Sequence, residues 1–165
     1  MSKSGLLVMK QINLQPEDTL YVLGDVVDRH PHGGRILRQL MKMPNVQLLL
    51  GNHEYMMLDA LDRPFNEKDW HQEDEHRRYL YQWYRNGGDV THAYLKHIKK
   101  ELRREIFDYL RKLPVNITIE VNGIKYKLVQ KTLKIRFKKL QKSLKTLINS
   151  TFLACHLFRS PNTKN

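Results

Sequence analysis

The sequence predicts an α/β fold, and three of its segments carry this prediction. The apolar runs 19–23 and 46–50 have the length and composition of buried strands. Residues 36–43 lie between them and repeat apolar side chains at helical spacing, so the two strands should run parallel with a right-handed crossover. Residues 115–129 read as two strands around Asn122-Gly123, the dipeptide most typical of a tight hairpin turn.

Most of the remaining chain is predicted to be helical. A short helix is expected at 5–12, and another over 55–61 after the second strand. The charged segment 62–76 should be a loop or an exposed helix. Residues 79–88 should form a helix that stops at its Asn-Gly-Gly end, because glycine accepts the backbone conformation that ends helices. One continuous helix over 92–113 is predicted from a single apolar stripe, which consists of Leu95, Ile98, Leu102, Ile106 and Leu110.

Charge divides the chain into two regions. Residues 1–120 contain 18 Lys and Arg against 17 Asp and Glu, whereas residues 121–165 contain 11 Lys and Arg and no acidic residue. This change predicts a folded domain over 1–129 and a divergent basic tail over 130–165. The tail is expected to be disordered or an amphipathic helix, since one helical face would carry Leu133, Phe137, Leu140, Leu144 and Leu147.

Composition excludes several classes of protein. Cys155 is the single cysteine, which excludes an internal disulfide and suits a reducing compartment. The first ten residues contain too short an apolar core for a signal peptide. No run approaches the roughly 20 apolar residues of a membrane-spanning helix. A soluble, cytoplasmic protein is therefore expected.

Two polar motifs follow the two apolar runs. Gly-Asp-Val-Val-Asp-Arg occupies 24–29, and Gly-Asn-His-Glu occupies 51–54. Because the carboxyl ends of neighbouring parallel strands meet at one edge of a sheet, the two motifs should lie close together. The second motif by itself could be a turn with a surface histidine, and it is the ordered pair of motifs that favours a site.

These residue types suit the hydrolysis of phosphate esters. A carboxylate can bridge two metal ions, and an Asn amide oxygen can bind one of them as a neutral ligand. Two metals held about 3.5–4 Å apart can present a hydroxide to phosphorus. An Arg fork binds phosphoryl oxygens, and a His oriented by an Asp can protonate the leaving oxygen.

The two motifs resemble those of the metallophosphatases of the calcineurin-like superfamily, and most closely the bacterial and phage serine/threonine protein phosphatases. Trp83–Gly88, Trp-Tyr-Arg-Asn-Gly-Gly, resembles a further pattern of that group, as does Leu113-Pro114 before a hairpin. The resemblance covers roughly residues 10–129. It implies a partial αββα metallophosphatase sandwich, consisting of the N-terminal half with an incomplete second sheet.

The resemblance also implies a role for each matching residue. Asp25 would bridge two divalent metal ions, which the family leaves open as Mn, Fe or Zn, and Asn52 would bind the second metal. His53 would protonate the leaving group, and Asp28 would orient it. Arg29 would bind the substrate phosphate. These are the expected catalytic, metal-binding and phosphate-binding residues, and the expected substrate is a phosphorylated protein or a small phosphate ester.

The sequence departs from the family pattern at several positions. The family's Asp-x-His-Gly motif is absent, and Gln130 stands where a metal-binding His is expected. The chain contains no Gly-His pair for the last metal-binding His. His30 replaces a usual Gly, while Glu54 keeps the motif and is expected to be structural. One expectation is that the chain is a fragment of a phosphatase with a shifted reading frame at its C-terminal end.

Three functions therefore stay open at this point. The chain could be a manganese-stimulated phosphatase, or an inactive relative that has lost its metal ligands. It could also be a basic binding module whose tail contacts anionic membrane or nucleic acid, although no specific nucleic-acid motif accompanies it. The sequence leaves the oligomeric state open.

Overall fold

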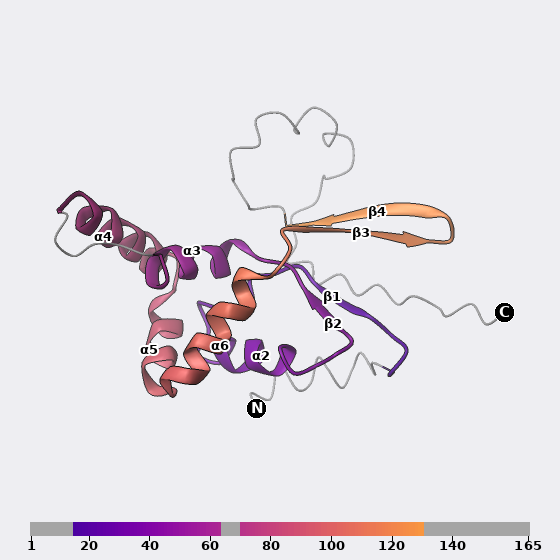
Figure 1. The fold of residues 1–165 in the computed structure, drawn as a ribbon, viewed down its shortest axis with the longest axis horizontal. Coiled ribbons are helices and arrows are strands. Elements are labelled where there is room, and N and C mark those ends of the chain that lie inside the picture. The colour runs from indigo at the N-terminus through magenta and orange to yellow at the C-terminus, as the bar shows by residue number, and fades with distance from the viewer. Residues whose placement is uncertain (1–14, 64–69, 131–165) are drawn as a thin grey trace.

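The computed structural model describes residues 15–63 and 70–130. Within these ranges the elements follow one another in the order β1 (Leu20–Val22), α2 (Gly33–Leu40), β2 (Val46–Leu48), α3 (Asn52–Leu61), α4 (Trp70–Arg85), α5 (Asp89–His97), α6 (Lys100–Arg111), β3 (Asn116–Val121) and β4 (Ile124–Val129). Helices α3 to α6 gather at one end of the molecule, and the β3–β4 hairpin extends away from them (Figure 1). The described residues confirm the predicted α/β class.

The first unit has the predicted strand–helix–strand topology. Strands β1 and β2 pair in parallel, with Leu20 opposite Val46 and Val22 opposite Leu48. Both strands are shorter than predicted, although the Leu49 amide still donates to the Val22 carbonyl at 2.8 Å. Helix α2 begins at Gly33, earlier than its apolar spacing suggested. The chain after each strand therefore leaves the same edge of this small sheet.

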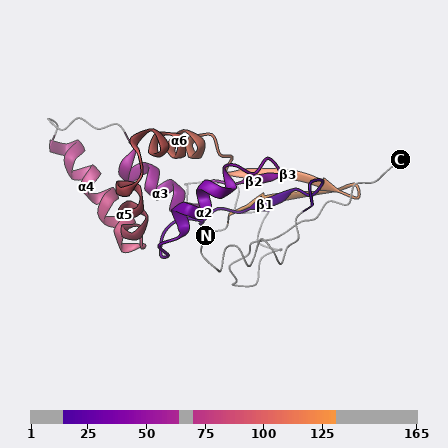
Figure 2. The same ribbon diagram turned by 90° about the horizontal axis from the view of Figure 1, so that it is seen from below.

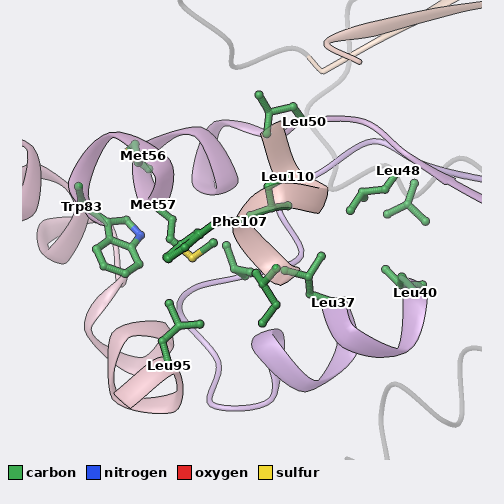
Figure 3. Packing of buried hydrophobic residues seen from close by; sticks show 14 of the residues in the cluster. Leu37, Leu40, Leu48, Leu50, Met56, Met57, Trp83, Leu95, Phe107 and Leu110 are labelled. Carbon is green, nitrogen blue, oxygen red and sulfur yellow. The ribbon is translucent and has the colours of Figure 1, made fainter. Parts of the chain in front are cut away.

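The hydrophobic core lies between this unit and the helices. Side chains from seven elements, β1, β2 and α2 to α6, contribute to it. Figure 3 shows part of this packing from close by. The largest of those that are fully buried are Trp83, Leu37, Leu48, Leu49, Met57, Leu95, Ile106 and Leu110. Because α4 contributes Trp83 and α5 contributes Leu95, the helical half and the sheet half share one core.

The predicted continuous helix over 92–113 is wrong. The chain leaves helical geometry at Ile98, with φ −96° and ψ 158°, and α6 starts after Lys99. The break allows α5 to bury Leu95 while α6 turns Ile106 and Leu110 into the same core. The apolar spacing continues across the break, so sequence periodicity does not reveal it.

The β3–β4 hairpin confirms the sequence prediction. The strands pair antiparallel, and the turn residues Asn122 and Gly123 have φ values of 52° and 76°. Two successive positive φ values are the geometry of a type I′ turn, which Asn-Gly favours. The Leu50 amide donates to the Pro114 carbonyl at 2.9 Å and so ties the start of the hairpin to the chain after β2.

Several predictions fall on parts of the chain that the structure does not describe. The expected helix at 5–12 and the basic stretch 131–165 lie outside the described residues, so the boundary between 129 and 130 stays a prediction. The segment 62–76 is helical from Trp70 onward. Within 15–63 and 70–130, no helix has both the length and the apolar character needed to cross a membrane.

The shared core makes a stability prediction. Replacing Leu110 with Ala should lower the free energy of unfolding by about 2–5 kcal/mol, because this fully buried side chain would leave a cavity. Chemical denaturation followed by Trp fluorescence measures the change. Leu113→Ala is the matched control, since that side chain is only partly buried and should lose less. Equal losses in the two variants would contradict the position of α6 in the core.

Candidate active site

The two polar motifs meet as the sequence predicted. The segment after β1 carries Asp25 and Asp28, and the start of α3 carries Asn52 and His53. The His53 amide donates to Asp25 Oδ1 at 3.0 Å, and the His53 ring reaches Asp28 Oδ2 at 2.8 Å. Two loops separated by a crossover helix therefore form one polar site.

The first motif has an unusual backbone. Asp25, Asp28 and Arg29 have φ values of 56°, 71° and 57°, which lie in the left-handed region. This conformation costs a residue with a side chain about 1–2 kcal/mol. Such a loop persists only where other contacts hold it. The Asp28 amide donates to Thr91 Oγ1 at 2.8 Å, and the Arg29 amide donates to the Gly87 carbonyl at 2.9 Å.

Glu54 is the main support of this loop. Its Oε2 accepts the Asp25 amide at 2.8 Å, and its Oε1 accepts the Val26 and Val27 amides at 2.7 and 3.1 Å. The side chain is fully buried. Burial raises the pKa of Glu54, and the three amide donors oppose this shift. The expected structural role of Glu54 agrees with these contacts.

The first glycine of each motif is explained by close backbone packing. A Cβ atom on Gly24 would lie 2.4 Å from the Gly51 Cα, and one on Gly51 would lie 2.3 Å from the Asp25 nitrogen. Gly24 also has a φ of 82°. Neither position has room for a side chain, so the two loops can come this close only because both residues are glycines.

Asp28 and His53 form a buried pair. Asp28 Oδ2 accepts two hydrogen bonds at 2.8 Å, one from His53 Nδ1 and one from Trp83 Nε1. The exposed fractions are 4% for Asp28 and 3% for His53, so water competes little with these contacts. Because a carboxylate only accepts, Nδ1 carries the hydrogen and Nε2 is left for other chemistry. Among the described residues, Asp28 Oδ1 is buried and has no hydrogen-bond partner.

Sequence reasoning missed the residues behind this pair. The sequence suggests Trp83 only as part of a family-like pattern. It predicts no role for Thr91 or for the Gly87 carbonyl. A Cβ on Gly88 would lie 2.3 Å from the Trp83 ring, so this glycine lets the ring reach Asp28. The Asn-Gly-Gly segment after α4 is the available signal, but by itself it predicts a helix stop and a family resemblance and not a contact with Asp28.

Arg29 and the two expected metal-binding residues are more exposed than the Asp28–His53 pair. Arg29 and Asp25 are exposed, and Asn52 is partly buried. The Asn52 amide donates to Gln130 Oε1 at 2.6 Å. Gln130, which stands where a metal-binding His was expected, therefore reaches the site but contacts the backbone of α3.

Comparison with known proteins identifies the family. The model of the calcineurin-like phosphoesterase family matches residues 6–151. This match covers most of the chain, and the chain belongs to that family. The matched range extends past residue 129, where the predicted phosphatase domain ended.

Two curated proteins share a short segment with the chain. A symmetrical bis(5'-nucleosyl)-tetraphosphatase from Acidovorax ebreus (strain TPSY) is 50% identical over 44 residues, which are 26% of this chain and 16% of that protein. A class 3 fructose-1,6-bisphosphatase from Lactococcus lactis subsp. lactis (strain IL1403) is 42% identical over 43 residues, which are 26% of this chain and 7% of that protein. The similarity thus spans a small part of each relative.

Members of this family usually bind two divalent metal ions, and the described residues do not fit such a centre. Over 15–63 and 70–130, no three His, Cys, Asp or Glu side chains are grouped so that they could hold a metal. Asp25 and Asn52 offer one carboxylate and one amide. Outside these ranges, residues 1–14 contain none of these four residue types, 64–69 contain Glu67 and Asp69, and 131–165 contain Cys155 and His156. Among the described residues, the expected pair of metals thus lacks a matching ligand set.

The support that Glu54 gives to the loop can be tested. Glu54→Gln should lower the free energy of unfolding by about 1–3 kcal/mol, because an amide nitrogen would face at least one of the buried amide donors. Urea denaturation measures the change. Glu105→Gln, on an exposed position of α6, is the control and should change stability little. A Glu54 variant as stable as the control would show that the three hydrogen bonds do not hold the loop.

Proposed function

We propose that the protein is a phosphoesterase that binds phosphate monoesters at residues 24–29 and 51–54 and protonates the leaving group. The observation that carries this proposal is the buried contact of 2.8 Å between Asp28 and His53. A histidine whose Nδ1–H is held by a carboxylate is oriented for proton transfer through Nε2. Membership of the calcineurin-like phosphoesterase family supports the reaction class.

In this proposal each residue has one task. The exposed Arg29 guanidinium binds two phosphoryl oxygens of the substrate. A water oxygen bonds to phosphorus as the bond from phosphorus to the ester oxygen breaks, and protonated His53 gives its Nε2 proton to that leaving oxygen. The proton lost by the attacking water passes to solvent, and solvent then restores the proton on His53. Asp28 keeps the ring oriented and stabilises its positive charge. Asp25 and Asn52 remain the proposed metal-binding positions, and no step is assigned to them.

We further propose a phosphorylated serine or threonine side chain as the substrate class. The Trp-Tyr-Arg-Asn-Gly-Gly segment and the paired motifs favour this class, because they resemble bacterial and phage protein phosphatases. The two curated relatives are named for a nucleotide substrate and a sugar-phosphate substrate, so small phosphate esters are the alternative. A cytoplasmic location also stays a proposal, which the single cysteine supports.

A second candidate function is phosphate-ester binding without turnover. The observation that favours it is the ligand set, since the described residues supply only Asp25 and Asn52 at the expected metal positions. In that case the His53–Asp28 pair and Arg29 would still recognise a phosphate group. The two candidates therefore share a binding site and differ in whether the ester bond breaks.

The protonating role of His53 predicts a dependence on the leaving group. His53→Gln should slow hydrolysis of a phosphoserine peptide at least about a hundredfold, because an alkoxide leaves poorly without a proton. The same variant should slow hydrolysis of p-nitrophenyl phosphate much less, since nitrophenolate leaves readily. Initial rates with both substrates measure the difference.

His71→Gln is the control, because this histidine lies on an exposed position in α4. Equal losses with the two substrates would contradict protonation by His53. No turnover of either substrate by the folded full chain, together with retained phosphate binding, would favour the second candidate.

The ligand set makes a separate prediction for metal binding. Calorimetric titration of the full chain with Mn²⁺ should show no pair of tight sites, because affinity grows with the number and charge of the ligands. Asp25→Asn should remove most of whatever binding remains. Two tightly bound Mn²⁺ ions per chain would contradict the inference that the ligand set is incomplete. They would favour a reaction that uses two metal ions.

A further inference from the structure

A basic groove lies between α2 and α5, away from the residues of the candidate active site. The two helices neighbour each other in the fold (Figure 2). The groove encloses about 660 Å³ and is lined by Arg35, Arg38, Gln39, Lys42, Tyr94, His97 and Ile98. None of these residues belongs to the two polar motifs, and the proposed function does not use them.

Close packing of the two helices builds the groove. A Cβ on Gly34 would lie 2.3 Å from the Tyr94 ring, so the ring packs directly on the α2 backbone. The Tyr94 hydroxyl accepts a hydrogen bond from Arg38 Nη1 at 3.2 Å. The helix break after α5 adds Ile98 to the lining. The groove is therefore held by backbone packing and by a tethered guanidinium.

The residues that line the groove carry a net positive charge. Three permanent cations line it, and no carboxylate does. Within the described ranges, Arg35, Arg38 and Lys42 form no ion pair with any acidic residue. Cations that lack a nearby carboxylate repel one another, and an anionic ligand in the groove would relieve this repulsion.

The spacing of the cations matches a chain of anionic groups. Arg35 and Arg38 lie three residues apart on α2 and share one helix face, and Lys42 lies in the turn just after α2 ends at Leu40. All three line the same groove. Tyr94 and Ile98 add an aromatic and an apolar surface on the α5 side. The volume falls in the range of roughly 300–1,000 Å³ that is usual for small-molecule sites.

We propose that the α2–α5 groove is a binding site for a small polyphosphate, a ligand with two or more linked phosphate groups. Arg38 binds one phosphate through its guanidinium, which the bond to Tyr94 tethers, and Arg35 and Lys42 bind the neighbouring ones. A nucleoside triphosphate places its base against Tyr94 and Ile98, whereas inorganic tripolyphosphate uses the cations alone. The site is separate from ester hydrolysis at His53.

The test is calorimetric titration of the full chain with tripolyphosphate and with ATP, in EDTA and about 0.15 M salt. Arg38→Gln/Lys42→Gln should weaken the binding of both at least about thirtyfold, because two charge-assisted contacts are lost. Arg104→Gln/Lys112→Gln is the matched control. It removes the same two residue types from exposed or partly exposed positions outside the groove, and should change affinity less than threefold. ATP binding tighter than tripolyphosphate would assign the ligand to nucleotides, and the reverse order would assign it to inorganic polyphosphate.

Further variants separate the groove from the active site and from misfolding. Because Arg29 is the proposed phosphate-binding residue of the active site, the titration is repeated in Arg29→Gln, where Arg38→Gln/Lys42→Gln should weaken the remaining binding by the same factor. Lys42→Gln alone, on an exposed side chain, should weaken binding about fivefold or more while the circular dichroism spectrum stays unchanged. Equal losses in the groove and control variants, or no further loss when the groove substitutions are added to Arg29→Gln, would overturn the proposal. Tighter binding of an oligoglutamate peptide than of either polyphosphate would overturn the ligand class.

Discussion

The buried carboxylate of Glu54 is the contact on which the site depends. It joins the start of α3 to three successive amides of the loop after β1. That loop contains three residues in the left-handed region, a conformation that the chain would not keep without support. Because both oxygens of Glu54 are used, the loop and the helix can take only one relative position. The positions of Asp25, Asp28 and His53 follow from it.

The helical half of the molecule completes this arrangement. Trp83 reaches from α4 to the same Asp28 oxygen that His53 contacts, and Thr91 holds the Asp28 amide from α5. Both helices also contribute to the hydrophobic core. The site is therefore supported from two sides by packed elements, and the buried Asp28–His53 pair is shielded from water. A proton donor oriented in this way is suited to a leaving oxygen rather than to general electrostatic binding.

In the described part of the chain, the residues expected for proton transfer are more complete than those expected for metal binding. Of the residues expected for proton transfer, Asp28 and His53 are in direct contact, and Arg29, which is expected to bind phosphate, follows Asp28 in the same loop. Two residues, Asp25 and Asn52, stand at the expected metal-binding positions. Gln130 accepts a hydrogen bond from the Asn52 backbone amide. The proposed role of His53 as proton donor depends on local packing, which its contact with Asp28 and the Trp83 contact to the same oxygen provide. A metal pair depends on ligands from several further strand ends, which the described residues do not supply.

The sequence by itself determined the local elements and the meeting of the two motifs. The parallel β1–α2–β2 unit followed from apolar spacing, the hairpin followed from Asn122-Gly123, and the convergence of Asp25 with His53 followed from strand topology. Only the tertiary structure decided the break at Ile98, the Trp83 contact and the position of Gln130. Periodicity and turn chemistry depend on neighbouring residues, whereas these features depend on contacts between distant segments that leave no periodic trace in the chain.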